Sequence, residues 1–206
     1  MRALPIIRQT VGQAFAVVLE DTRARRDARF TDTVVTIKDR VGDVARVSRR
    51  LAEDEELEAL FIAGVNAAVD TGLKAKRRHL AKVISAAILD DARVDESALI
   101  VQTLRELDAP HFRALERIRR EQDTEPEDRS GDAPPGGRPS PHQHVVDTVE
   151  QESEPVISAL VRAGTLRQVT GGLVFGIGGN LVVTGLTEFG RTLLDNVLAE
   201  DTKHQL

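Results

Sequence analysis

Apolar residues recur at alternating spacings of three and four along residues 30–51, the pattern of an amphipathic helix. The stripe that they form consists of Val34, Ile37, Val41, Val44 and Leu51. The first fifty residues are therefore predicted to be helical, either as one long helix or as two helices with a break near the charged stretch 23–29. A stripe of about three heptads has to be covered, either by the chain's own helices or by a second copy in a coiled coil.

Residues 53–121 keep the helical period through four short segments with tight connections. Asp54 is placed to cap the first segment, and Gly72 follows its end, where a left-handed residue is favoured. The second segment covers residues 74–89, Asp95 is placed to cap the third, and Asp108 opens the fourth. This pattern predicts a compact helical bundle.

Residues 122–144 contain five of the eight prolines and almost nothing apolar, which predicts a disordered linker. After it, the pattern predicts a helix over residues 154–163 that ends at Gly164, and strands over residues 165–169, 173–177 and 181–184 with a turn at residues 178–180. A final helix begins at Thr187. The order of helix, glycine-rich hairpin and closing helix is that of a winged helix.

The expected fold is thus mainly α, a helical bundle with a long N-terminal helix followed by a winged-helix-like unit with a small β-hairpin. We expect a long helix or helical hairpin over residues 1–52, a bundle over 53–121, the linker over 122–144 and the winged unit over 145–206. If the unit is a winged helix, the helix at 109–121 becomes its first helix and the linker becomes an insertion.

Composition narrows the class of protein. The 206 residues include no Cys, Trp or Tyr, so the core is built from aliphatic side chains, and disulfides and thiolate metal sites are excluded. The apolar run Ala14–Leu19 is too short for the hydrophobic part of a signal sequence, and no stretch reaches the roughly 18 apolar residues of a membrane span. These features predict a cytoplasmic protein without a membrane partner.

The C-terminal region resembles the ending of many bacterial winged helices, in which a Leu-Thr-x-x-Gly-Arg turn enters the last helix. The matching residues here are Leu186, Thr187, Gly190 and Arg191. A wider resemblance joins the helical block at 57–89, the acidic junction at 90–96 and the turn Leu104–His111 to the winged unit; it is similar to uncharacterised bacterial proteins of the Abi-alpha type. The resemblance implies a link to phage defence or stress response, and it supplies no catalytic residues.

Charge argues against DNA reading by the winged unit. The helix at 154–163 offers only Glu154, Ser158, Ala159 and Arg162 outward, the stretch 171–180 has no basic residue, and residues 145–206 carry four Lys and Arg against eight Asp and Glu. Such a segment repels a phosphate backbone. A DNA-binding role would have to use the N-terminal arginines Arg23, Arg25, Arg26 and Arg29, or the second basic patch at Lys74–Arg78.

Other candidates for chemistry are weak. The acidic residues Asp90, Asp91, Asp95 and Glu96 lack the spacing of a calcium loop, His142 and His144 lack a third metal ligand, and the glycines at 176–179 precede a strand rather than a helix. No catalytic constellation, cofactor site or metal site is therefore expected. The favoured hypothesis is a non-catalytic interaction protein that forms a homodimer through the stripe Val34–Leu51; the alternative is a winged-helix transcriptional regulator that binds DNA through its basic N-terminal helix.

Overall fold

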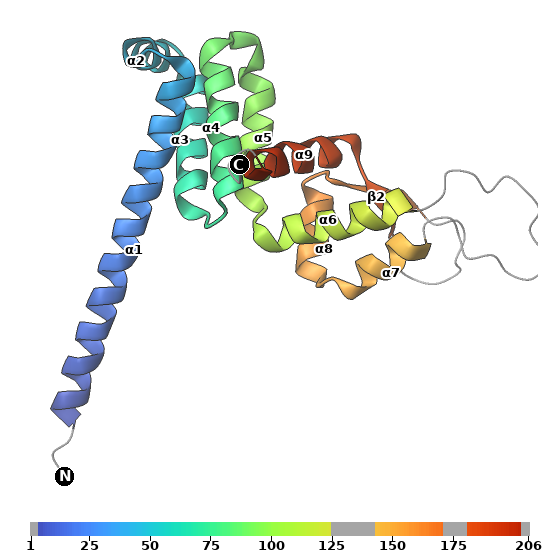
Figure 1. The fold of residues 1–206 in the computed structure, drawn as a ribbon, viewed down its shortest axis with the longest axis horizontal. Coiled ribbons are helices and arrows are strands. Elements are labelled where there is room, and N and C mark those ends of the chain that lie inside the picture. Colours follow the sequence, from blue (N-terminus) through green and yellow to red (C-terminus); the bar gives the residue numbers. More distant parts are fainter. Residues whose placement is uncertain (1–3, 125–142, 171–180, 203–206) are drawn as a thin grey trace, which may run out of the picture. The chain divides into compact units, whose positions relative to one another are not determined.

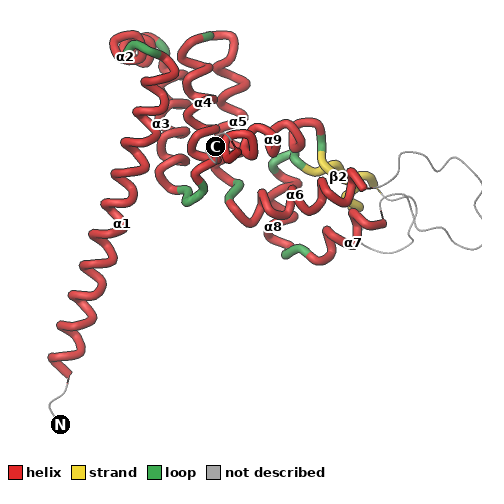
Figure 2. The backbone as a smooth tube through the Cα atoms, viewed as in Figure 1, coloured by secondary structure: helices red, strands yellow, loops and turns green. Residues whose placement is uncertain are grey.

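The computed structural model describes residues 4–124, 143–170 and 181–202, with side chains described from residue 16 onward and not at residues 143, 169–170, 181–182 and 201–202. Among them the fold is mainly helical, with a small two-stranded antiparallel sheet near the C-terminus (Figures 1 and 2). Contacts divide the chain into two compact units, residues 1–102 and residues 103–206. The expected mainly α fold is confirmed.

The first unit begins with α1 (Leu4–Val41), an uninterrupted helix of 38 residues. Of the two alternatives, one long helix or two with a break near residues 23–29, the structure has a helix that continues through that stretch. It ends before Gly42, whose φ of 82° is accessible to glycine without a side-chain clash. Asp43 then accepts a hydrogen bond from the backbone N–H of Ala45 at 2.8 Å and starts α2 (Val44–Glu53). Local charge did not break α1 because Arg and Asp are compatible with helix, whereas glycine with positive φ is not.

Two antiparallel helices, α3 (Glu55–Asp70) and α4 (Lys74–Leu89), complete the centre of this unit with α1 beside both. Asp54 caps α3 as expected, since its Oδ1 accepts from the N–H of Leu57 at 3.0 Å. The expected left-handed role of Gly72 is wrong: α3 ends at Thr71, which has a φ of −85°, and the positive-φ glycines among the described residues are Gly42, Gly164 and Gly185.

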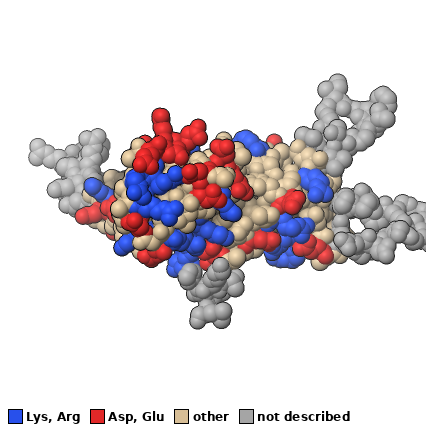
Figure 3. All heavy atoms as spheres, turned by 90° about the horizontal axis from the view of Figure 1, so that it is seen from above, with Lys and Arg blue, Asp and Glu red and all other residues tan. Residues whose placement is uncertain are grey.

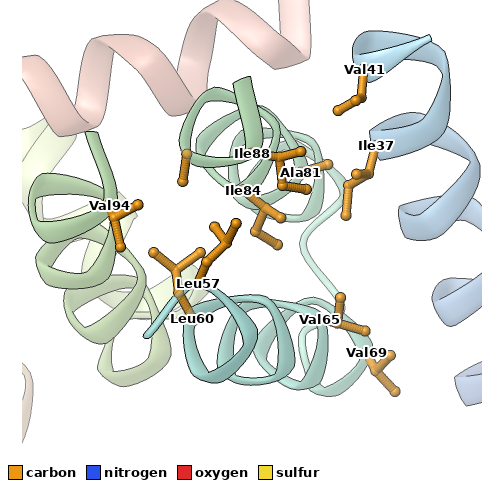
Figure 4. Close-up of a cluster of buried hydrophobic side chains, with 11 residues drawn as sticks. Ile37, Val41, Leu57, Leu60, Val65, Val69, Ala81, Ile84, Ile88 and Val94 are labelled. Carbon is orange, nitrogen blue, oxygen red and sulfur yellow. The ribbon is translucent and has the colours of Figure 1, made fainter. Parts of the chain in front are cut away.

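One buried apolar cluster holds the first unit together, and Figure 4 shows its side chains pointing into the space shared by the helices. Gly64 on α3 lets α4 approach closely, because a Cβ there would lie 2.7 Å from Cδ1 of Ile84. The cluster consists of Ile37, Val41, Leu57, Leu60, Val65, Val69, Ala81, Ile84, Ala87, Ile88 and Val94, with Val47, Leu51 and Phe61 packed against it.

The connection to α5 (Val94–Glu106) differs from expectation at its start. Asp90, rather than Asp95, supplies the cap: its Oδ1 accepts from the N–H of Ala92 at 3.2 Å and begins a single 3₁₀ turn, Asp91–Arg93, which leads directly into α5. Sequence alone could not rank two Asp residues five positions apart, because both precede an apolar run.

The second unit is organised around α6 (Ala109–Thr124), which contacts α7 (Gln143–Gln151), α8 (Glu154–Arg162), β2 (Leu181–Leu186) and α9 (Glu188–Thr202). The strands β1 (Leu166–Thr170) and β2 pair with a register irregularity between Arg167 and Gln168. Gly164, with a φ of 69°, ends the turn after α8 as expected. The expected strand over 173–177 and turn over 178–180 lie outside the described residues.

The boundaries expected from composition differ from these units. The chain divides after Gln102, within α5, and residues 109–124 belong with the C-terminal unit because α6 packs against α7, α8 and the hairpin. Residues 125–142 come between α6 and α7 in the sequence, so they fall within the second unit rather than at the junction of the two units. Most of the expected linker, residues 125–142, lies outside the described residues.

Candidate functional site

The N-terminal half of α1 is the most exposed described helical surface of the first unit. Every described side chain from residue 16 to residue 28 is exposed, and Figure 1 shows this part of α1 running beyond the ends of α3 and α4. Val17, Val18 and Leu19 are 60%, 59% and 67% exposed, although all three are large and apolar. We call residues 4–25 the α1 arm and these three residues the apolar triplet.

The arm ends where two arginines attach α1 to α3. Nη1 of Arg29 donates to the carbonyl of Val69 at 3.0 Å, and Arg26 pairs with Asp70 at 2.8 Å. Both partners lie in the last turn of α3, where carbonyls lack helical partners and the helix dipole favours a cation. Sequence reasoning grouped these two arginines with Arg23 and Arg25 as nucleic-acid contacts, but the structure uses them to hold the helix.

The other two members of that group remain on the arm. Arg25 lies 3.9 Å from Asp21, one turn earlier, and both side chains are largely exposed. Such an exposed pair contributes at most a fraction of a kcal/mol, roughly 0.3–0.5. Arg23 is exposed as well. The arm is therefore of mixed charge next to the apolar triplet, and the four arginines do not form one continuous basic surface.

The second basic patch, Lys74–Arg78, is also partly used inside the unit. Nη1 of Arg77 lies 3.4 Å from the carbonyl of Thr71, and its Nε is 3.9 Å from a carboxylate oxygen of Asp32. Burial lowers the pKa of Arg77; Asp32 opposes this effect, and the neighbouring cations Arg29 and Arg78 add to it. Arg77 thus joins the start of α4 to α1. These contacts give Arg77 a structural role that requires no bound phosphate.

The stripe predicted for self-association lies mostly in the core of the first unit. Ile37 and Val41 are 2% and 8% exposed, Leu51 packs against the same cluster and Val34 is half-buried, whereas Val44 is 54% exposed. The chain's own helices therefore cover most of the stripe, as one of the two alternatives proposed. Of the residues in this stripe, only Val44 is exposed enough to contact a second copy.

The outward face of α8 carries little that could read a base. Glu154 and Ser158 are exposed, and Arg162 pairs with Glu106 at 3.0 Å. The expectation that Ala159 also faces outward is wrong, since it is buried at 7% exposure. Small apolar residues on a helix give no periodic signal strong enough to distinguish the two faces of a nine-residue segment.

Charge in the second unit is internally paired and acidic. Its described residues include eight Arg and thirteen Asp and Glu. Besides Arg162, three arginines have carboxylate partners: Arg117 with Glu152, Arg119 with Asp195 and Arg191 with Asp123. On the face drawn in Figure 3, basic and acidic side chains are interspersed. Half of the arginines described in this unit are thus paired with carboxylates, and its described acidic residues outnumber the basic ones, which disfavours binding of a phosphate backbone.

The Leu-Thr-x-x-Gly-Arg motif has a structural role in this unit. Oγ1 of Thr187 donates to the carbonyl of Gly164 at 2.7 Å and accepts from the N–H of Gly190 at 2.9 Å, so Thr187 caps α9 as expected and also joins it to the end of α8. A Cβ on Gly190 would lie 2.1 Å from the carbonyl oxygen of Thr165. Arg191 reaches Asp123 on α6 at 3.0 Å. The motif thus fixes where β1, α6 and α9 meet.

Among the described residues, side chains that could take part in catalysis or bind a metal do not lie together in one site. No group of three or more His, Cys, Asp or Glu there could hold a metal ion. Two shallow hollows of about 230 and 430 Å³ open at the surface, the first lined by charged residues of α6 and the second by the α2–α3 junction with Glu53, Glu55 and Glu58. Of the acidic residues at 90–96, Asp90 is a cap and Asp91 pairs with Arg50. His144 is exposed, and His142 lies outside the described residues.

Comparisons with known proteins add no assignment. No family model, no curated protein and no solved structure matches the chain. In the described part of the chain, no helix has the length and apolar character needed to cross a membrane.

The apolar triplet was not proposed as a site from the sequence. By sequence pattern alone, the run Ala14–Leu19 is only a short apolar stretch, too short for the hydrophobic part of a signal sequence. The sequence feature that could have indicated the triplet is the change from apolar to charged residues at Glu20. A helix that is apolar around its whole circumference before that point needs a partner for its apolar part.

Proposed function

We propose that this is a non-catalytic cytoplasmic protein that acts through protein–protein contacts, and that it associates with itself through the α1 arm. One observation carries the proposal: three consecutive large apolar side chains, Val17, Val18 and Leu19, are exposed on a helix that extends beyond the other helices of its bundle. Most helical stability in proteins comes from packing an apolar face rather than from intrinsic propensity. A long unpacked helix with such a triplet is best explained by a partner that packs against it.

Two further features support contact with protein rather than nucleic acid. The cations that a DNA-binding helix would need are mixed with Glu20 and Asp21 on the arm, and Arg26 and Arg29 are engaged with α3. The winged unit is acidic over its described residues. A role in phage defence or stress response remains part of the proposal on the strength of the Abi-alpha resemblance, and plating efficiency of phages on cells with and without the gene tests it.

Light scattering coupled to size exclusion tests the self-association. The wild-type chain is expected to elute at twice its monomer mass of 22.5 kDa over a dilution series, with little change between low and moderate salt. The Val18→Glu variant is expected to elute as a monomer, because two charges would be buried at the contact. A mixed-sequence DNA duplex added at low salt is expected to leave the elution unchanged.

Val35→Glu provides the matched control. Val35 lies on the same helix with a similar exposure of 47%, but it is beyond the arm, beside the bundle. This variant is expected to keep the wild-type mass. A wild-type chain that is monomeric at every concentration, or a dimer that Val35→Glu disrupts and Val18→Glu does not, would refute the proposal.

A further inference from the structure

We propose that the partner of the apolar triplet is the α1 arm of a second copy, lying antiparallel and crossing near Val18. This inference rests on the proposed function and adds the identity, the direction and the register of the contact. It follows from three properties of the arm: its length, the order of its charges and the position of the triplet within it.

The length of the arm suits a pair of helices. From Leu4 to Arg25 the arm rises over 21 residues, about 32 Å at 1.5 Å per residue. That span is about three heptads, close to the minimum over which two helices pair stably. Val18 lies about two thirds of the way along, so an antiparallel arm centred there overlaps residues 11–25, and residues 4–10 lie along the continuation of the partner's α1.

The order of charges selects the direction. Directly after the triplet come two acids, Glu20 and Asp21, and then two bases, Arg23 and Arg25. In a parallel pair in register with Val18 at the contact, Arg25 lies one heptad further on the same face and is set beside its own copy, and like charges side by side oppose pairing. Glu20 and Arg23 lie on the opposite side of the helix from Val18, so the repulsion between the two Arg25 side chains is the charge conflict that selects the direction.

An antiparallel pair removes that conflict. With the crossing at Val18, the two copies of Arg25 lie 14 residues apart along the axis, about 21 Å, which exceeds the Debye length of about 8–10 Å at ordinary ionic strength. The apolar triplets meet in the same arrangement: the two copies of Val18 face each other, with the two copies of Val17 on one side of the contact and the two copies of Leu19 on the other. The contact is then two-fold symmetric and self-complementary, the common form of a homodimer interface.

The same charges disfavour a membrane surface as the occupant. Helices that lie on membranes combine an apolar face with a polar face rich in Lys and Arg. On the arm, the triplet is followed first by Glu20 and Asp21, which anionic lipids repel. A second copy needs no such basic face.

Single cysteines distinguish the two directions, because the natural chain has no Cys. Helix axes roughly 10 Å apart leave about 5 Å between facing Cα atoms at the crossing, within the range that a disulfide requires. We expect the Val18→Cys variant to shift to doubled mass on a non-reducing gel after mild oxidation. The Arg25→Cys variant, one heptad further on the same face, is expected to stay at monomer mass, as is Val35→Cys, the control for random collision.

Each variant is first checked by light scattering under reducing conditions, so that a lost dimer is not mistaken for an absent crosslink. Crosslinking of both Val18→Cys and Arg25→Cys would show parallel arms and overturn the inference while leaving self-association intact. A dimer in which neither crosslinks would place the contact on another surface and also overturn it. A wild-type chain that is monomeric throughout would refute the proposed function itself and leave the triplet to a different protein.

Discussion

Gly190 is the position at which a single added methyl group should most destabilise the second unit. In the Gly190→Ala variant the new Cβ would meet the Thr165 carbonyl oxygen at 2.1 Å, whereas ordinary contacts begin near 3.4 Å. β1 and α9 must therefore separate by about 1.3 Å, and the hydrogen bond from the N–H of Thr187 to the same carbonyl, now 3.0 Å long, is lost. The obstacle is backbone, so no side-chain rotation relieves it.

The expected cost follows from three terms. Forced separation of packed elements costs about 1–3 kcal/mol, the lost hydrogen bond costs about 1 kcal/mol, and alanine regains about 1 kcal/mol over glycine inside a helix. The net destabilisation is about 2 kcal/mol, which corresponds to a drop in Tm on the order of 10 °C for a unit of this size. Thr165 is fully buried, so water cannot replace the lost partner.

The assay has to report on this unit alone, because two units that unfold separately have no single Tm. Hydrogen exchange followed by mass spectrometry is suited to this, with peptides from residues 160–168 and 183–200 compared with peptides from α3 and α4. We expect faster exchange in the first set only. Gly72→Ala is the control: nothing lies within 4 Å of a Cβ there and its φ is not positive, so stability should be unchanged or raised by about 0.4–1 kcal/mol. Equal exchange in the two variants would refute the close-approach explanation of the motif.

Three further substitutions test packing and attachment. Ile37→Ala should destabilise the first unit by about 2–5 kcal/mol because a buried side chain is removed, whereas Val44→Ala, at an exposed site of the same predicted stripe, should cost little; equal losses in urea unfolding would argue against the core position. Arg29→Ala should cost about 1–3 kcal/mol by removing the charged hydrogen bond to the end of α3, and Arg23→Ala should leave the unfolding midpoint unchanged. Gln122→Ala should cost about 1–3 kcal/mol because a backbone N–H of β2 loses its acceptor at 3.0 Å, and an unaltered exchange rate for that amide would contradict this.

Helix caps were predictable from the sequence where one residue of a type that favours the N-cap preceded the helical run. Asp54 is the only Asp, Asn, Ser or Thr in the acidic stretch 53–56, Thr187 directly precedes the last helix, and both cap as expected. Both Asp90 and Asp95 precede the run at 97–107; the pattern favours Asp95, whereas the structure uses Asp90. Capping is a local hydrogen bond, but the choice between two equivalent caps depends on where the helix has to lie to bury its apolar face.

The candidate site shows the same difference between what is local in the sequence and what depends on packing. The sequence identified the arginines of α1 correctly as a dense basic stretch, but their spacing contains no information about the end of α3, which lies about forty positions further along the chain. Whether a cation is free for a ligand is decided by its neighbours in space. For the same reason the stripe Val34–Leu51 could be recognised as apolar, yet only packing showed that α3 and α4 already cover its centre.

By itself, the sequence determined the mainly helical character of this protein, the hairpin before a closing helix, and the absence of cysteine chemistry, because hydrophobic period, turn residues and composition are local properties. Tertiary structure decided three things: which of the two expected placements α6 takes, that Arg26 and Arg29 hold α1 to α3, and that Val17, Val18 and Leu19 are left without cover. The physical reason is that burial and pairing are relations between distant segments. A periodic apolar pattern states that a face must be covered, and only the packed fold shows which faces the chain has covered itself.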